Sequence, residues 1–80
     1  MKIHHDKETK RFYIVFDSGE QAELKYRLQD DSGVDFYSTF VPNTERGKGL
    51  AAGLVEHGFE WAKQQGLEIY ASCWYAREFI

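Results

Sequence analysis

The residues best suited to chemistry lie in one glycine-rich segment, 46–51, which runs Arg-Gly-Lys-Gly-Leu-Ala. Glycines at 47 and 49 remove the side chains that would keep another molecule away from the main chain. A helical pattern follows at once, so the segment stands at a helix start, where the first amides have no internal partner and the peptide dipole is positive. Arg46 and Lys48 add formal charge. The segment therefore predicts a cradle for an anion such as phosphate.

A sulfur nucleophile, Cys73, is the second candidate for chemistry, and it is the one cysteine of the chain. It follows a short apolar strand pattern and so belongs to the carboxyl edge of the sheet, the edge at which open α/β sheets bind ligands. A position just before a helix, with Arg77 one turn along, would lower the thiol pKa below its free value of about 8.5. An isolated cysteine is also often a small buried apolar residue, and the residues alone leave both interpretations open.

Short alternating segments predict an antiparallel meander before the glycine segment. Three of them have the apolar alternation of strands, and Leu28 is among the residues expected to point inward. They span 11–17, 20–28 and 34–41. Turn residues separate them at 17–20 and 30–33. Residues 1–5 predict an edge strand, followed by a turn at 6–9.

One long amphipathic helix is expected after the bend, from about Thr44 or Glu45 to Gln65, with Gly66 as its terminator. A strand over 67–72 and a short helix over 74–80 complete the chain. A strand, a crossover helix and a strand give a parallel pair, 34–41 beside 67–72. The expected fold is one α+β domain over 1–80, with a mixed, mostly antiparallel sheet, one long crossover helix and a short C-terminal helix.

Several phosphate-binding motifs share the ingredients of this bend. A Walker A loop fails, because Pro42 and Gly49 stand where it needs a glycine and a Ser or Thr. A dinucleotide fingerprint is loosely met by Gly47, Gly49 and Ala52, with Glu68 about twenty residues on. That alternative stays open, although three antiparallel strands before the loop are unlike a Rossmann unit.

The pattern Q/R-x-x-G-x-G/A is met by Arg46, Gly49 and Ala51, and here the sequence resembles the GCN5-related N-acetyltransferase (GNAT) superfamily. The flanking residues narrow the resemblance. Val-Pro-x-x-x-Arg-Gly-Lys-Gly-Leu-Ala, followed about twenty residues later by a strand ending in cysteine, looks like the minimal single-domain branch of that superfamily. The similarity runs from about Phe12 to Ile80.

This resemblance implies that the bend holds the pyrophosphate of acetyl-coenzyme A, a cosubstrate, and that no metal is needed. It also implies that the two parallel strands splay apart and that the pantetheine arm enters the gap between them. The residues expected to contact coenzyme A are Thr39, Phe40, Val41, Arg46, Gly47, Lys48, Gly49, Leu50 and Ala51. The acceptor, a small molecule or a protein amine, is not specified by the sequence.

The resemblance gives Cys73 two possible roles. Its thiolate would take the acetyl group and pass it on, or it would line the acetyl pocket while an amine attacks directly. Tyr75 is a candidate proton donor to the departing thiolate. This branch often has a His-Thr pair before the bend, and here the pair is Ser38-Thr39, so the expected base is missing. A non-catalytic coenzyme A-binding module is therefore the alternative function.

Composition limits the remaining possibilities. A net charge of −3 and a pI near 5.5 argue against a general nucleic-acid binder. With one cysteine, no secretory signal pattern and no apolar run of about twenty residues, a cytoplasmic protein with no membrane partner is expected. Adjacent residues His4 and His5 point to opposite faces of a strand and so predict no metal site. His57 is expected on the solvent-facing side of the long helix.

Overall fold

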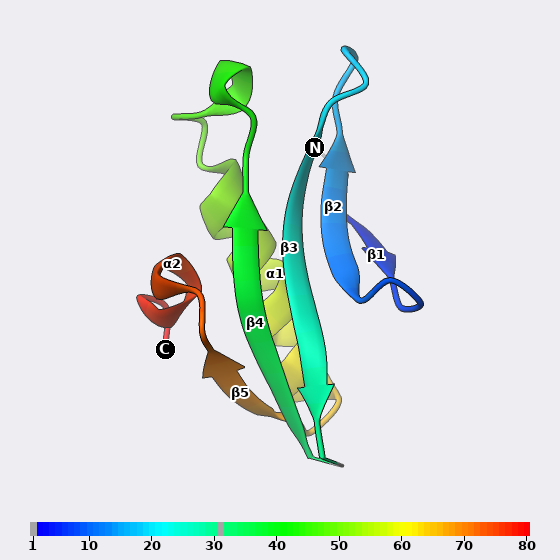
Figure 1. The fold of residues 1–80 in the computed structure, drawn as a ribbon, viewed down its shortest axis with the longest axis vertical. Helices are drawn as coiled ribbons and strands as arrows, with labels where there is room; N and C mark the ends of the chain where they lie inside the picture. The colour runs from blue at the N-terminus through cyan, green and yellow to red at the C-terminus, as the bar shows by residue number, and fades with distance from the viewer. Residues whose placement is uncertain (1, 31) are drawn as a thin grey trace.

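The computed structural model of this protein describes residues 2–30 and 32–80. It shows a five-stranded sheet with one long helix across one face (Figure 1). The strands follow the chain order across the sheet. They are β1 (His4–Asp6), β2 (Arg11–Val15), β3 (Gln21–Gln29), β4 (Gly33–Phe40) and β5 (Glu68–Ala71). Neighbouring strands from β1 to β4 are antiparallel, and β5 is parallel to β4. This confirms the predicted α+β fold; the predictions at Met1 and Asp31 fall outside the described residues.

The long helix α1 (Leu50–Gln64) begins about five residues later than the sequence pattern predicted. Residues Asn43–Glu45 form a separate 3₁₀ turn, η1, in which the amide of Glu45 donates to the carbonyl of Pro42. Gly47 and Gly49 then take φ values of 83° and 76°. A helix cannot pass through such left-handed residues, so the prediction of a start at Thr44 or Glu45 was wrong.

Helix α1 packs closely on the middle of the sheet. Its buried residues are Leu54, Val55, Gly58, Phe59 and Ala62. A Cβ atom on Gly58 would lie only 2.9 Å from side-chain atoms of both Leu24 and Phe36. The glycine thus sets the distance between the helix and strands β3 and β4.

The prediction that Leu28 points inward was wrong, because 51% of its surface is exposed. Its register partner is Val34, near the end of the β3–β4 hairpin. Val34 is fully buried while Leu28 is exposed, so the cover at this level of the sheet lies over β4 and does not extend to the paired position on β3. The alternation of β3 was correct, but alternation does not show whether another element covers the strand at a given position.

The chain ends with a short helix, α2 (Trp74–Arg77), beside the carboxyl end of β5. It is shorter than the predicted 74–80, although turn hydrogen bonds continue to Ile80. In the part of the chain that the structure describes, neither helix has the length and apolar character needed to cross a membrane.

Candidate functional site

A β-bulge in β4 decides which side chains of this strand face α1. Lys25 pairs with Ser38 and Tyr26 pairs with Phe36, so Tyr37 is an extra residue on β4. One extra residue inverts the alternation that follows it. Thr39 pairs with the buried Leu24 and therefore joins Phe36 on the helix side of the sheet. Without the bulge, Ser38 and Phe40 would have faced the helix instead.

Strands β4 and β5 separate at the same level as the bulge. Their pairing runs from Gly33 beside Glu68 to Phe36 beside Ala71, and the amide of Cys73 still donates to the carbonyl of Phe36 at 3.1 Å. Beyond this bond the described strands give β4 no partner on its β5 side, and α2 turns away from it (Figure 1). A main-chain edge is thereby open to an extended molecule.

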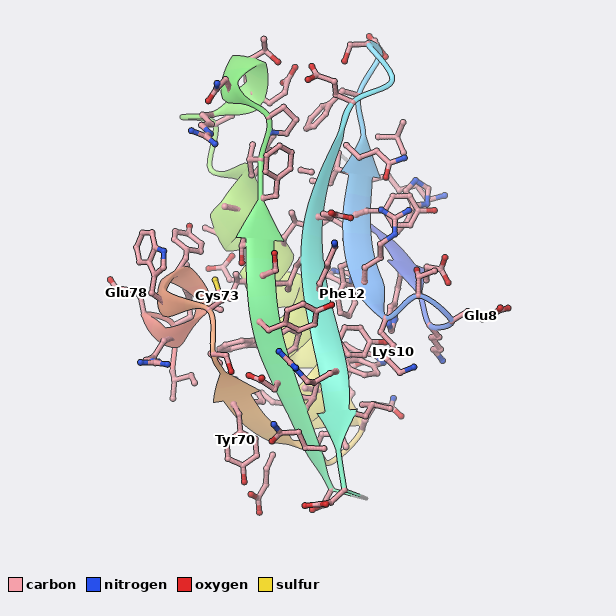
Figure 2. The ribbon with its side chains drawn as sticks, in the orientation of Figure 1. Glu8, Lys10, Phe12, Tyr70, Cys73 and Glu78 are labelled. Carbon is pink, nitrogen blue, oxygen red and sulfur yellow. The ribbon has the colours of Figure 1, made fainter. Side chains whose placement is uncertain are left out.

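A cavity of about 520 Å³ lies where the strands separate, and it connects the glycine bend with the thiol. Its lining comes from the end of β4, the bend, the first turn of α1 and the start of α2. The lining residues are Thr39, Phe40, Val41, Glu45, Arg46, Gly47, Gly49, Leu50, Ala51, Cys73, Trp74 and Tyr75. Figure 2 shows the sulfur of Cys73 between α2 and β4. The structure thus brings the two candidate groups, far apart in sequence, into one cleft.

The bend presents backbone amides to this cleft. No described side chain caps the start of α1, and the first bond within the helix is from the amide of Gly53 to the carbonyl of Gly49. A Cβ atom on Gly47 or Gly49 would meet no described atom within 4 Å. The glycines are therefore required by their backbone conformation, and the space beside them is open. Unpartnered amides at the positive end of a helix dipole favour an anion.

The two cations of the bend have different positions. Arg46 lines the cavity and donates one hydrogen bond, from Nε to the carbonyl oxygen of Val41 at 3.0 Å. Lys48 does not line the cavity, and its Nζ lies 2.8 Å from Oε1 of Glu45. Glu45 belongs to η1 rather than to the first turn of α1, where the sequence placed it. Arg46 is consequently the better placed of the two for contact with a bound phosphate.

The thiol of Cys73 is half-buried and its Sγ lies 3.4 Å from the Thr39 hydroxyl oxygen. Burial by itself would raise the thiol pKa. Hydrogen bonds from the Thr39 hydroxyl and from the amides of Ala76, Tyr75 and Thr39 outweigh it, so the pKa of Cys73 lies below its ordinary value. The predicted direction is the same, but Arg77 is not its cause, because its Nε donates to the carbonyl of Ala71.

The other predicted residues are divided between the cleft and the rest of the surface. Phe40 and the half-buried Tyr75 line the cleft. Ser38 pairs with Lys25 on the sheet face opposite α1 and does not line the cleft. Trp74 lines the cleft although 75% of its surface is exposed, and sequence reasoning missed it. The only indication of its position was that it follows Cys73 directly.

The histidines lie away from the cleft. His57 is exposed on α1, with its ring edge against Phe12. His4 stacks on Tyr13 and His5 stacks on Phe12, on opposite faces of the sheet, as alternation requires. Among residues 2–30 and 32–80, no three His, Cys, Asp or Glu side chains are grouped closely enough to hold a metal ion.

The fold and the cleft together define a small α+β domain in which a glycine-rich bend and a thiol line the two ends of one cleft. The sequence model of the family described as GCN5-related N-acetyl-transferase matches residues 11–80, and the chain belongs to this family. The described sheet has a single parallel pair, which also argues against the doubly wound dinucleotide fold.

Known proteins similar to this chain agree with that assignment. Protein NATD1 of Danio rerio is 28% identical over 81 residues, covering 100% of this chain and 74% of the relative. Protein NATD1 of Homo sapiens is 25% identical, with 100% and 72% covered. The NMR solution structure of a GCN5-like protein from Staphylococcus aureus superposes with a TM-score of 0.76 at 28% identity, covering 98% of this chain and 76% of that one.

Proposed function

We propose that this protein binds acetyl-coenzyme A in the cleft and transfers its acetyl group to an amine acceptor. One observation carries the proposal: open backbone amides at the bend and a half-buried thiol line the same cavity. Membership of the GCN5-related N-acetyltransferase family supports it. An activated acetyl group on a long chain that ends in a diphosphate has the two chemical features that such a cleft can recognise.

The residues of the cleft suit the parts of coenzyme A. Amides of residues 49–51 and the Arg46 guanidinium are suited to the diphosphate, because they combine the helix dipole with charge-assisted hydrogen bonds. The main chain at Phe40 and Val41, beyond the contact of Thr39 with Cys73, is suited to the amide groups of the pantetheine arm. Thr39 and Cys73, at the point of separation, would then lie beside the acetyl thioester.

Acetyl-coenzyme A would supply an acetyl thioester whose carbonyl carbon accepts a nucleophile. In the covalent route, the Cys73 thiolate, whose proton has gone to water, bonds through Sγ to that carbon, the carbon–sulfur bond to coenzyme A breaks, and the departing thiolate takes a proton from Tyr75 or water. The acceptor amine then attacks the S-acetyl group, the Cys73 thiolate leaves, and the amine proton goes to the Tyr75 phenolate or to water. In the direct route the amine attacks the thioester itself and Cys73 lines the pocket.

The covalent route is tested by mass spectrometry of the protein after incubation with acetyl-coenzyme A. We expect a gain of one acetyl group that neutral hydroxylamine removes, because hydroxylamine cleaves thioesters but not amides. Cys73→Ala should abolish the gain while leaving coenzyme A binding in place. An adduct that resists hydroxylamine, or one that persists in Cys73→Ala, would contradict a role for this thiol. Turnover without any adduct would indicate the direct route.

A non-catalytic coenzyme A-binding module is the second candidate. It is favoured by Ser38, which has no basic group and lies on the sheet face away from Thr39 and the cleft. No histidine is among the residues that line the cleft. This candidate expects saturable coenzyme A binding with no loss of acetyl-coenzyme A above the spontaneous rate. A steady-state assay with a panel of amines, run beside a binding titration, separates the two functions.

A further inference from the structure

Asp35 is the one fully buried charged side chain in the described part of the protein, with 3% of its surface exposed. Both carboxylate oxygens accept hydrogen bonds from a single residue, Ser72. Oδ1 accepts from the Ser72 amide at 2.8 Å and Oδ2 accepts from the Ser72 hydroxyl at 2.7 Å. Burying a carboxylate is costly, and two hydrogen bonds of this kind are what make it tolerable.

The cation near Asp35 does not explain its burial. Nε of Arg27 lies 3.4 Å from Oδ2, but 57% of the Arg27 side chain is exposed. An ion pair with one exposed partner contributes little, because water and salt screen it. The contacts that distinguish Asp35 are therefore those with Ser72, 37 residues away in the chain.

Ser72 is the residue at which the chain leaves the sheet. β5 ends at Ala71, and the next amide, that of Cys73, donates to the carbonyl of Phe36. Three hydrogen bonds at two consecutive residues thus fix the chain to β4 directly before the thiol. Beyond Cys73 the chain enters α2, which has only four residues and is too short to be stable by itself. Its position depends on the buried Ala76, on the bond from Arg77 to Ala71 and on the attachment at Ser72, and of these only Ser72 directly precedes the thiol.

We propose that Asp35 is a positioning residue that holds the Cys73 thiol against Thr39 and against the first amides of α2. The role of such positioning in acetyl transfer rests on the proposed function. The positioning itself does not, because it can be measured in the protein without coenzyme A. Failure of the positioning role can therefore be distinguished from failure of the proposed acetyl transfer.

The sign of a change in thiol pKa separates positioning from a simple charge effect. A carboxylate near a thiolate repels it, so removal of the Asp35 charge alone would lower the pKa of Cys73. Loss of positioning has the opposite effect, because the thiolate then loses hydrogen bonds from Thr39 and from the amides of α2. Other ionisable groups around the thiol, Glu45 and Arg46 of the bend and Tyr75 and Arg77 of α2, are unchanged in this comparison.

The experiment measures the pKa of Cys73 in three variants from the pH dependence of its Cβ chemical shift. NMR is suited to this because folded and unfolded molecules give separate signals, so the folded protein is measured alone even in a destabilised variant. Asp35→Ala removes both hydrogen-bond acceptors and should raise the pKa of Cys73 in the folded protein. Asp35→Asn removes the same charge, but the asparagine can still make two hydrogen bonds to Ser72. The pKa of Cys73 should therefore not rise in this variant. Ser72→Ala, at an exposed position, keeps the hydrogen bond from the backbone amide to Asp35 and should give a smaller rise in the pKa of Cys73. If Asp35→Ala does not fold, Ser72→Ala is the variant that tests the proposal.

The rate of thiol alkylation at neutral pH gives the same answer independently, since the thiolate is the reactive form. We expect the rate to fall several-fold in Asp35→Ala and to recover in Asp35→Asn. A lower pKa in Asp35→Ala, or equal rises in the Ala and Asn variants, would overturn the proposal. An unchanged pKa in both folded Asp35→Ala and Ser72→Ala would overturn it as well.

Discussion

The side chains of Thr39 and Cys73 meet at the point where β4 and β5 separate, with Oγ1 and Sγ 3.4 Å apart although the two residues are 34 positions apart in the sequence. The contact depends on the bulge at Tyr37, which turns Thr39 toward the helix side of the sheet. It also depends on the bond from the Cys73 amide to the Phe36 carbonyl. A backbone irregularity and a strand end therefore bring the Thr39 hydroxyl and the Cys73 thiol together.

Replacement of Thr39 should raise the pKa of Cys73, because the hydroxyl is the strongest of the groups that lower it. In Thr39→Val the shape is kept and the donor is lost, so the pH at which alkylation becomes half-maximal should move upward. Thr39→Ser is the matched control and should retain most of the wild-type profile. The measurement is the alkylation rate against pH without coenzyme A. Identical profiles for the Val and Ser variants would show that the hydroxyl does not act on the thiol.

Gly49→Val should abolish coenzyme A binding while the domain stays folded. Gly66→Val is the matched control, because Gly66 has a similar φ of 72° and equally open surroundings but lies at the other end of α1. Both variants carry a backbone cost of about 1–2 kcal/mol. Only Gly49→Val places a side chain in the cleft, and calorimetry should show a loss of more than about 2 kcal/mol of binding free energy. Equal affinities in the two variants would exclude the bend as the diphosphate site.

Much of this fold could be predicted from the sequence because each element had a local cause. The clean alternation of β3 and the terminating Gly66 placed one strand and the end of α1 correctly. The start of α1 was wrong because the sequence pattern does not show that Gly47 and Gly49 are both left-handed. The prediction for Leu28 was wrong because burial depends on which neighbouring element covers a position, and alternation within a strand does not show this.

The sequence indicated several residues that line the candidate cleft but not the geometry of that cleft. Arg46, Gly49 and Cys73 were found by type and spacing, and all three line the cleft. The bulge at Tyr37 was not predicted, since it is a mismatch in length between two paired strands rather than a motif. For the same reason the contact of Asp35 with Ser72 has no local indication in either segment.

Tyr75→Phe should slow acetyl transfer without weakening coenzyme A binding, if Tyr75 supplies the proton to the departing thiolate. Tyr75 is half-buried and lines the cleft, so its ring would remain as packing in the Phe variant. Loss of a general acid typically costs on the order of a hundredfold in rate. The check is kcat with the best acceptor found, beside a coenzyme A titration. Parallel losses in kcat and in affinity would instead indicate a binding role.

Substitution by alanine at two glycines of α1 should change the free energy of unfolding in opposite directions. At Gly58 a Cβ atom would meet Leu24 and Phe36 at 2.9 Å, and both side chains are fully buried and cannot move aside. Overpacking of this kind typically costs about 1–3 kcal/mol. At Gly53 a Cβ atom would meet nothing within 4 Å among the described residues, so alanine should stabilise the helix by about 0.5–1 kcal/mol. Urea denaturation of both variants measures the difference, and a shared sign would contradict the close approach at Gly58.

The stability of the fold should fall in mild acid because of His5. Its ring stacks on Phe12 and its Nε2 lies 2.7 Å from the Tyr26 hydroxyl. Burial is the main cause that lowers the pKa of His5, Lys7 and His57 add to it, and Asp6 opposes it. The unfolded chain therefore binds the proton more tightly than the folded protein does. The stabilising contribution is complete above the unfolded pKa of about 6.5 and is lost as the pH falls through the folded pKa.

The variant His5→Phe keeps an aromatic ring on Phe12 and removes the titrating group, so it should flatten this part of the pH dependence. Free energies of unfolding from urea denaturation between about pH 5 and pH 8 measure the slope, which is positive wherever the unfolded state binds more protons. His4→Phe, on the opposite face of the same strand, is the control and should keep the wild-type slope. A wild-type slope that survives in His5→Phe would assign the acid sensitivity to other groups, and the contact between β1 and the core would then not depend on pH.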